Sequence, residues 1–242
     1  IMRILIDINH PADVHQFRNM IDILQKKKHE ILVVARDKDV TYQLLTAYGI
    51  PFIRRKGYKG IIGKNLGIMK IDFALYNIAK KFSPDLLIGS SGNCYIAHVS
   101  KLLRKKSVVF CDTEHARIQN LLTFPFADKV CVPDSFLQDL GKKEVRYNSY
   151  KELAYLHPNN FKPDVNVLKK LNGKGRYFLI RFVEWQASHD IGQRGIPDKE
   201  ALVDSLAKIG RIFISSEATL LPKFEKYRLM TDPSEIHSVL SF

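Results

Sequence analysis

The first 133 residues alternate between short apolar runs and longer runs with the periodicity of helices. The apolar runs lie at 2–8, 29–36, 51–57, 85–91, 107–113 and 129–133, and the helical runs at 17–28, 39–49, 68–82, 95–106 and 116–127. Near-continuous apolar runs are typical of strands that are covered on both faces. Strands that alternate with helices indicate crossover connections. The sequence therefore predicts an α/β fold built on a parallel sheet.

The pattern weakens after residue 137 and then restarts near residue 176. Residues 176–183 and 211–216 are predicted strands, 197–210 a predicted helix, and 233–242 the beginning of another helix. We therefore expect two lobes of the same design, at 1–160 and 161–242, joined near residues 157–172. Two strands are too few for a stable parallel sheet, and the last helical pattern has no C-cap. The second lobe is accordingly expected to be truncated.

Composition narrows the class of protein. The chain has 242 residues and a net charge of +13, and no run reaches the ~18 apolar residues of a membrane helix. Its 3 cysteines show no paired spacing, which favours reduced thiols and a cytoplasmic location. Lysine clusters at 26–28, 80–81, 104–106 and 169–170 end predicted helices, where cations favour the helix dipole. Because no nucleic-acid motif accompanies them, no nucleic-acid partner is expected.

Polar residues gather after the predicted strands. Ligands of open parallel sheets bind beyond the carboxyl ends of the strands, so these residues are candidate contacts to substrate. They are Asn9 and His10 after the first strand, Gly57, Lys59 and Gly60 after the third, Ser91 and Asn93 after the fourth, His115 after the fifth, and Arg181, His189, Arg194 and Glu217 in the second lobe. The lysines that end the helices belong to the opposite edge of the sheet.

Two glycine-containing stretches each allow two interpretations. Residues 56–67, KGYKGIIGKNLG, form either a flexible hairpin or a backbone nest that holds phosphate beside lysines. They are not a P-loop, because G-x-x-x-x-G-K-[ST] is absent, and we expect them to be a mobile loop. GSSGN at 89–93 either binds an anion or a sugar hydroxyl through backbone N–H groups or is only a tight turn.

The stretch DINHPADVHQF, residues 7–17, carries more polar groups than a strand-to-helix turn needs. One interpretation is that Asp13 caps a helix and Pro11 ends the strand, but this leaves His10 and His15 unexplained. No metal-ligand spacing is matched, so we favour hydrogen bonding to a polar ligand over a metal site.

CDTEHARIQN, residues 111–120, places two carboxylates and a histidine after a buried strand. Burying the carboxylates without partners would be costly. Either Arg117 pairs one of them structurally, or the group performs general acid–base chemistry on hydroxyls. We take His15, Asp112 and Glu114 as candidate catalytic residues, and expect them to line one pocket together with His10.

Several segments together resemble a prokaryotic family catalogued as a domain of unknown function: DINHPADVHQFRN, GYKG–IIGK, GSSGN, FCDTEHARIQNLLTFPFADKV, YKELAYLHPNNFKPD, RFVEWQASHD and ISSEA–LP. That family resembles GT-B proteins, which have two Rossmann-like lobes with a cleft between them. The resemblance also relates the chain in kind to non-hydrolysing UDP-N-acetylglucosamine 2-epimerases and to the N-acetylglucosaminyltransferase of peptidoglycan synthesis.

The resemblance implies a glycosyltransferase that uses a nucleotide-diphosphate sugar in the synthesis of cell-surface polysaccharide or glycoconjugate. One of the three catalytic candidates would take the acceptor proton, while Arg181 and the loop to Arg194 supply charge to the donor diphosphate. Such enzymes generally need neither a catalytic metal nor a cofactor. The implied partners are the sugar nucleotide and a glycan or lipid-linked acceptor, with peripheral association at the inner face of the membrane left open.

Two other functions stay open on the same resemblance. One is a UDP-sugar 2-epimerase, in which Asp112, Glu114 and His189 would fill the catalytic roles. The other is a non-catalytic protein that binds a sugar nucleotide or a partner.

Overall fold

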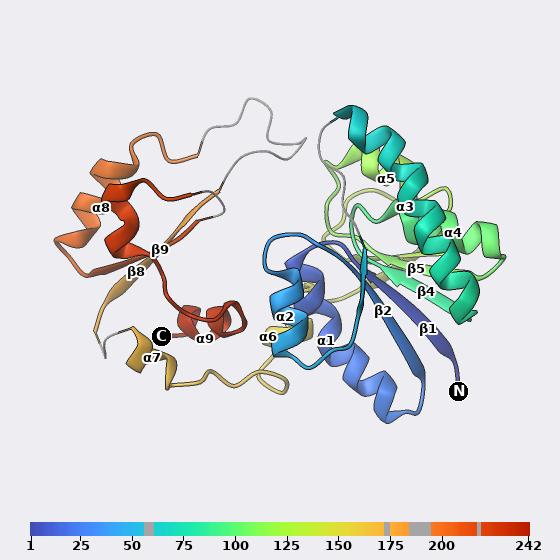
Figure 1. The fold of residues 1–242 in the computed structure, drawn as a ribbon, viewed down its shortest axis with the longest axis horizontal. Coiled ribbons are helices and arrows are strands. Elements are labelled where there is room, and N and C mark those ends of the chain that lie inside the picture. The colour runs from blue at the N-terminus through green and yellow to red at the C-terminus, as the bar shows by residue number, and fades with distance from the viewer. Residues whose placement is uncertain (56–60, 172–174, 184–194, 217–218) are drawn as a thin grey trace. The chain divides into compact units, whose positions relative to one another are not determined.

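The computed structural model describes residues 1–55, 61–171, 175–183, 195–216 and 219–242. The chain divides into two compact units, Ile1–Phe161 and Lys162–Phe242 (Figure 1). In the part of the chain that is described, no helix is both long enough and apolar enough to cross a membrane.

The first unit is built on a seven-stranded sheet in the order β3-β2-β1-β4-β5-β6-β7. Its strands are β1 (Arg3–Ile8), β2 (Glu30–Arg36), β3 (Ile53–Arg55), β4 (Leu86–Gly89), β5 (Lys106–Phe110), β6 (Lys129–Pro133) and β7 (Glu144–Tyr147). Every neighbouring pair is parallel. The predicted α/β fold is thus confirmed. The strand order reverses between β1 and β4, which is where ligands of doubly wound sheets bind.

Strand β7 is absent from the sequence prediction. It lies at the edge of the sheet with β6 as its one neighbour, and none of its four residues is buried. A strand with little buried surface needs no apolar run, so its sequence EVRY resembles that of a loop.

Helices cover both faces of this sheet: α1 (Pro11–Lys26) and α2 (Thr41–Ala47) on one, α3 (Ile61–Phe82) and α4 (Cys94–Leu103) on the other. Alternate strand residues therefore enter different cores. Ile6 and Ala35 pack with α1 and α2, whereas Leu5 and Val34 pack with α3 and α4. This alternation also decides which polar side chains at the strand ends can meet. The unit also contains the helices α5 (Arg117–Thr123) and α6 (Leu153–Leu156) and a 3-10 turn at Gly141–Lys143.

Helix α3 overturns part of the expected glycine-rich loop. It begins at Ile61, so residues 61–67 are helical, while Gly57, Lys59 and Gly60 lie outside the described residues. Each glycine inside a helix costs about 1 kcal/mol relative to alanine. The buried stripe of Ile71, Leu75 and Ala79 stabilises the rest of this long helix by packing, which offsets that cost.

The second unit contains the parallel pair β8 (Tyr177–Phe182) and β9 (Arg211–Ser216). Its helices are α7 (Val167–Lys170), α8 (Lys199–Ala207) and α9 (Ile236–Leu240). Helix α8 begins after Asp198, whose side chain accepts hydrogen bonds from two backbone N–H groups. The main hydrophobic core of the second unit is formed by Ile180, Phe182, Val203, Ile212, Ile214, Leu220 and Phe224. Both strands predicted for this part of the chain are present.

His98 on α4 joins the neighbouring helices α3 and α5. Its Nδ1 lies 2.9 Å from Oδ2 of Asp72, and its Nε2 lies 2.9 Å from the carbonyl oxygen of Leu122. Both partners are acceptors, so both ring nitrogens can donate at once when the imidazole is protonated. The hydrogen bond to Asp72 is the main reason that the pKa of His98 lies above 6.5.

We expect the stability contributed by His98 to fall as the pH rises. Because the pKa is higher in the folded state, this contribution is complete below about pH 6.5 and is lost as the pH passes the folded value. His98→Gln should lower the free energy of unfolding by about 1 kcal/mol at acidic pH and by less at alkaline pH. Urea unfolding at several pH values measures this. The exposed His157→Gln variant is the control, and an equal effect of His98→Gln at every pH would contradict the assignment.

Candidate functional site

A polar cleft of about 30 Å³ lies at the carboxyl edge of the sheet, near the strand-order reversal. Side chains from four places in the sequence converge there. They are Asp13 and Gln16 of α1, Ser90 and Ser91 after β4, Phe110, Cys111 and Asp112 at the end of β5, and Tyr147 and Lys151 around β7. The cleft therefore belongs to the edge at which the sequence predicts ligand binding.

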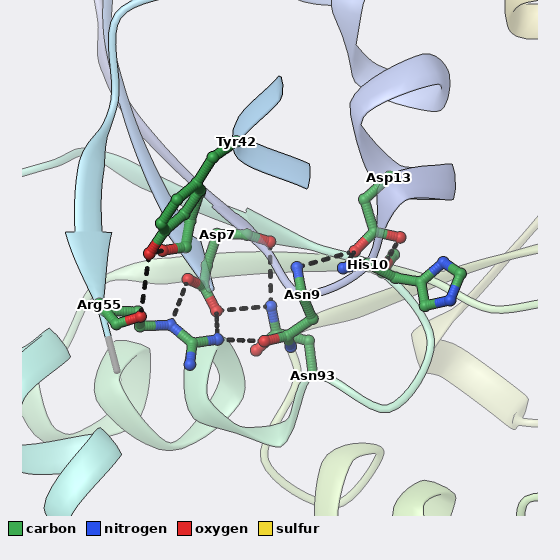
Figure 2. A network of polar contacts seen from close by, with 9 residues as sticks. Asp7, Asn9, His10, Asp13, Tyr42, Arg55 and Asn93 are labelled. Atoms are coloured by element: carbon green, nitrogen blue, oxygen red, sulfur yellow. Dashed lines mark hydrogen bonds and ion pairs between the residues drawn. The ribbon is translucent and has the colours of Figure 1, made fainter. Parts of the chain in front are cut away.

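Asp13 is held there by the first turn of α1. The helix begins at Pro11, and His10 is its N-cap, with Nδ1 accepting a hydrogen bond from the backbone N–H of Ala12 at 3.2 Å. Oδ2 of Asp13 accepts from the backbone N–H groups of Asn9 at 2.9 Å and His10 at 3.0 Å (Figure 2). The capping role predicted for Asp13 is confirmed, and His10 has a capping role that was not predicted.

The carboxyl group of Asp13 is poised to exchange a proton near neutral pH. Its other oxygen, Oδ1, accepts a hydrogen bond from Ser90 Oγ at 2.6 Å, and the residue is only 5% exposed. Burial raises the pKa of Asp13 to about 6, although its three hydrogen bonds act in the opposite direction. A carboxyl group with such a pKa is suited to general acid–base chemistry.

Asp112 lies in the same cleft, but its pKa is lowered rather than raised. Its burial acts to raise the pKa, but a 2.5 Å ion pair with Lys151 and a 3.0 Å hydrogen bond from Thr113 outweigh it, so the pKa lies below 3.8. Asp112 is also 3.4 Å from Ser91 Oγ. The cleft thus combines one carboxyl that stays ionised with one that can gain and lose a proton.

A buried charge network centres on Asp7, near the end of β1, next to the backbone of Asn9 and His10 that bonds Asp13 (Figure 2). Arg55 donates from Nε and Nη2 to the two carboxylate oxygens of Asp7, each at 2.9 Å, and the two side chains are 3% and 0% exposed. Asn93 donates to Oδ2 of Asp7 at 2.8 Å. Asn9 accepts from Arg55 Nη2. Asn9 and Asn93 therefore hold this network, and their contact with substrate stays a prediction.

Gly89 has no side chain, and this leaves the space that the Asn93 amide occupies. A Cβ atom added to Gly89 would lie 3.0 Å from Nδ2 of Asn93, so any larger residue would press on the amide that bonds Asp7. The pairing of Asp7 with Arg55 is not predicted from the sequence. The signals were a carboxylate between Ile6 and Ile8 in a buried strand and an arginine at the end of another strand, but nothing local pairs them.

The expectation that His10, His15, Asp112 and Glu114 line one pocket is wrong. Asp112 alone among them lines the polar cleft. His15 is 7% exposed, lies 3.2 Å from the hydroxyl of Tyr48, and packs on the ring of Tyr155 at 5.5 Å between centroids. Asp13 and His15 are two positions apart on a helix, which turns them to different sides.

Glu114 contributes to a different cavity, of about 410 Å³, lined by Glu114, Arg117, Asn120, Leu121, Phe124, Pro125, Val130, Gln138, Leu140 and Lys143. Its Oε1 accepts from the backbone N–H groups of Leu137 at 2.5 Å and Gln138 at 3.0 Å. Glu114 therefore holds the connection between β6 and β7. Within the described residues, no ion pair joins Arg117 to Asp112 or Glu114. Lys151 pairs with Asp112 instead, and backbone N–H groups bond Glu114.

The other predicted contacts are distributed over both units. Ser91 lines the cleft, and His115 is exposed nearby in the sequence. Arg181 is exposed on β8 of the second unit. His189, Arg194 and Glu217 lie outside the described residues. Among the residues that the structure does describe, no group of three or more His, Cys, Asp and Glu side chains could hold a metal ion.

Comparison with solved structures shows where this fold recurs. The UDP-GlcNAc 2-epimerase of Neisseria meningitidis, bound to UDP-GlcNAc, matches 99% of the chain and 76% of its own length, at 12% identity and a TM-score of 0.68. A putative UDP-N-acetylglucosamine 2-epimerase of Listeria monocytogenes matches 99% and 72%, at 11% identity and 0.68. Acinetobacter baumannii MurG matches 97% and 66%, at 13% identity and 0.52. These likenesses show the α/β fold of the GT-B type.

No curated protein matches the sequence. A family model described as "Protein of unknown function (DUF354)" matches residues 2–216. That range spans nearly the whole of the first unit and continues through β9 of the second. The chain therefore belongs to the DUF354 family.

Proposed function

We propose that this chain acts as a GT-B-type glycosyltransferase, using a nucleotide-diphosphate sugar to build a cell-surface polysaccharide or glycoconjugate. The observation that carries the proposal is the carboxyl group of Asp13, whose pKa is raised to about 6 within the polar cleft. The fold supports it, because the same fold occurs in an epimerase bound to UDP-GlcNAc and in MurG.

Sugar transfer needs a group that accepts a proton from the acceptor. The acceptor hydroxyl oxygen attacks the anomeric carbon of the donor sugar, and the bond from that carbon to the diphosphate breaks. The hydroxyl proton passes to Asp13, which is mostly ionised at pH 7 because its pKa is about 6. The Ser90 hydroxyl holds Oδ1 in place at 2.6 Å. Asp112 keeps a fixed negative charge, balanced by Lys151 at 2.5 Å.

The predicted catalytic residues take different parts in this proposal. Asp112 lines the cleft and remains a candidate for contact with the acceptor. His15 belongs to α1 and helps to fix the position of this helix through its contacts with Tyr48 and Tyr155. Glu114 orders the backbone at Leu137 and Gln138. We assign His15 and Glu114 positioning roles.

The proposed partners follow from the reaction. The first unit would bind a glycan or lipid-linked acceptor, and the second would bind the donor diphosphate, with Arg181 supplying charge. We propose that the reaction uses no cofactor and no metal, and that it takes place in the cytoplasm at the inner face of the membrane.

A UDP-sugar 2-epimerase is the second candidate, favoured by the pairing of an ionised and a protonatable carboxyl in one cleft. In that reaction a base removes the proton at C2 of the sugar while UDP leaves. A proton then returns to C2 from the other face as UDP is added back. Asp13 and Asp112 could serve as the two groups, with His189 assisting from the second unit.

Incubating the protein with UDP-, GDP-, CDP- and dTDP-sugars, followed by mass spectrometry, tests both candidates. We expect nucleoside diphosphate to appear only when an acceptor is added. An epimerised sugar nucleotide formed without an acceptor would replace this proposal with the epimerase. Binding of a sugar nucleotide without any product would indicate a non-catalytic binding protein.

A further inference from the structure

Two arginines lie side by side at the carboxyl ends of β2 and β3. Arg36 and Arg55 are register partners in the parallel pair formed by these strands. Their side chains share a face of the sheet, because Val34, two residues before Arg36, packs with α3 and α4, and Arg55 reaches Asp7 on that same face. Arg54, the residue before Arg55 on β3, points to the opposite face, where its guanidinium lies 5.2 Å from the ring centroid of Tyr42.

Each arginine has a buried guanidinium nitrogen with an unused hydrogen-bonding capacity. Among the described residues, Nη1 of Arg55 and Nε of Arg36 are buried without a hydrogen-bond partner. The Arg55 side chain is 3% exposed. Figure 2 shows its third guanidinium nitrogen directed away from Asp7 and Asn9. An unsatisfied buried donor costs about 1–3 kcal/mol, so two of them on side chains of register partners favour binding an acceptor group.

The charge balance at this point is positive. Asp7 neutralises Arg55, whereas in the described part of the chain no acidic side chain forms an ion pair with Arg36. Tyr95, whose ring centroid lies 5.2 Å from the Arg55 guanidinium, does not supply a negative charge. Burial raises the pKa of Tyr95 to about 12, although Arg55 and Arg36 both act to lower it, so its phenol stays neutral at physiological pH.

We infer that Arg36 and Arg55 form a subsite for a phosphate group of a bound ligand. A phosphate offers three or more acceptor oxygens, so it can bridge two guanidinium groups, whereas a carboxylate oxygen pair is used up by one fork. Asp7 fixes the Arg55 guanidinium through two bonds, which leaves Nη1 pre-oriented. Arg36 is partly exposed, so a ligand enters the subsite from its side.

The subsite goes beyond the proposed sugar transfer and does not depend on it. A consequence for the acceptor does rest on the proposed function. If the protein is a sugar transferase, the subsite makes the acceptor a phosphorylated molecule, which is held by its phosphate at β2 and β3 while its hydroxyl reaches the cleft at Asp13. The phosphate could belong to a small soluble ester or to a lipid headgroup, and the two sources share the same recognition chemistry.

Titration calorimetry with inorganic phosphate and pyrophosphate, at constant ionic strength in potassium chloride, tests the subsite without requiring turnover. We expect Arg36→Gln to weaken binding by roughly 10- to 100-fold, as loss of a charge-assisted hydrogen-bond pair implies. The Arg36→Lys variant keeps the charge but loses the two-pronged guanidinium group, so its affinity for phosphate should lie between those of the wild-type protein and the Arg36→Gln variant. Acetate should bind more weakly than phosphate. Vesicles containing phosphatidylglycerol, sedimented with each variant, identify a headgroup source if binding to them depends on Arg36.

Arg54→Gln is the matched control, because it removes the same charge one residue away on the opposite face. It should leave phosphate binding unchanged. Phosphate binding absent from the wild-type protein would overturn the inference, as would equal affinity in the wild-type protein and the Arg36→Gln variant. Equal losses in the Arg36→Gln and Arg54→Gln variants would also overturn it, since they indicate a general effect of net charge. Circular dichroism and thermal unfolding establish that each variant is folded.

Discussion

Replacing Asp7 with alanine is expected to lower the free energy of unfolding by about 3–5 kcal/mol, the usual result of removing one member of a buried ion pair. Asp7 is 0% exposed and Arg55 is 6% exposed. The variant would leave the Arg55 guanidinium in the interior without its carboxylate. It would also remove one of the two acceptors of Asn93 Nδ2, the other being the backbone carbonyl oxygen of residue 7. Urea unfolding monitored by circular dichroism measures the change.

A double replacement separates the ion pair from the space it fills. Asp7→Leu combined with Arg55→Met removes both charges, so it should be less destabilising than Asp7→Ala alone. Asp22→Ala on α1 is the control, because it breaks an ion pair with Lys26 in which both side chains are more than half exposed; such pairs contribute about 0–1 kcal/mol. An effect of Asp7→Ala no larger than that of Asp22→Ala would show that the network does not stabilise the fold.

Asp13→Asn should reduce turnover by about 10²–10⁴-fold, the range for loss of a general base, without reducing stability at neutral pH. Asparagine keeps an oxygen for the backbone N–H groups of Asn9 and His10, and its amide can donate to Ser90 Oγ. It cannot take a proton from a hydroxyl. The assay uses the sugar nucleotide that the substrate panel identifies, with product quantified by mass spectrometry.

Stability against pH tests Asp13 independently of activity. Its pKa is about 6 in the folded state against 3.8 for an unperturbed group, so the folded state binds more protons between these values. The contribution of this group to stability is therefore greatest below about pH 4, decreases as the pH rises, and is constant above about pH 7. A shift of about two units corresponds to about 3 kcal/mol. Asp13→Asn should be more stable than the wild-type protein by up to that amount at pH 8.

The exposed Asp22→Asn variant provides the comparison on the same helix. Its stability difference from the wild-type protein should vary little with pH. A difference between the wild-type protein and Asp13→Asn that is the same at pH 4 and pH 8 would remove the basis for a raised pKa. Unchanged turnover in a folded Asp13→Asn protein would exclude it as the catalytic base and return attention to Asp112.

The sequence predicts the edge of the sheet at which the candidate site lies, but not the partners of the side chains there. That polar residues after β1, β4 and β5 meet at one edge follows from parallel strands, and Ser91 and Asp112 lie in the cleft as part of that edge. Lys151, which pairs with Asp112, comes from beyond β7, a strand that the sequence pattern does not reveal. Asp13 was assigned only its capping role, because nothing in a single sequence shows that its carboxyl group is buried against Ser90.

The succession of strands and helices, the parallel sheet and the edge at which polar residues gather can all be read from the amino-acid sequence. These depend on local periodicity and on the turn chemistry of neighbouring residues. Three features depend on the packing of distant segments and cannot be read from local sequence. Asp7 pairs with Arg55, His15 packs against Tyr48 and Tyr155 rather than facing the cleft, and Asp13 has a pKa of about 6. Burial and ion pairing depend on which segments meet in the folded chain, and Asp7 meets a partner 48 residues away.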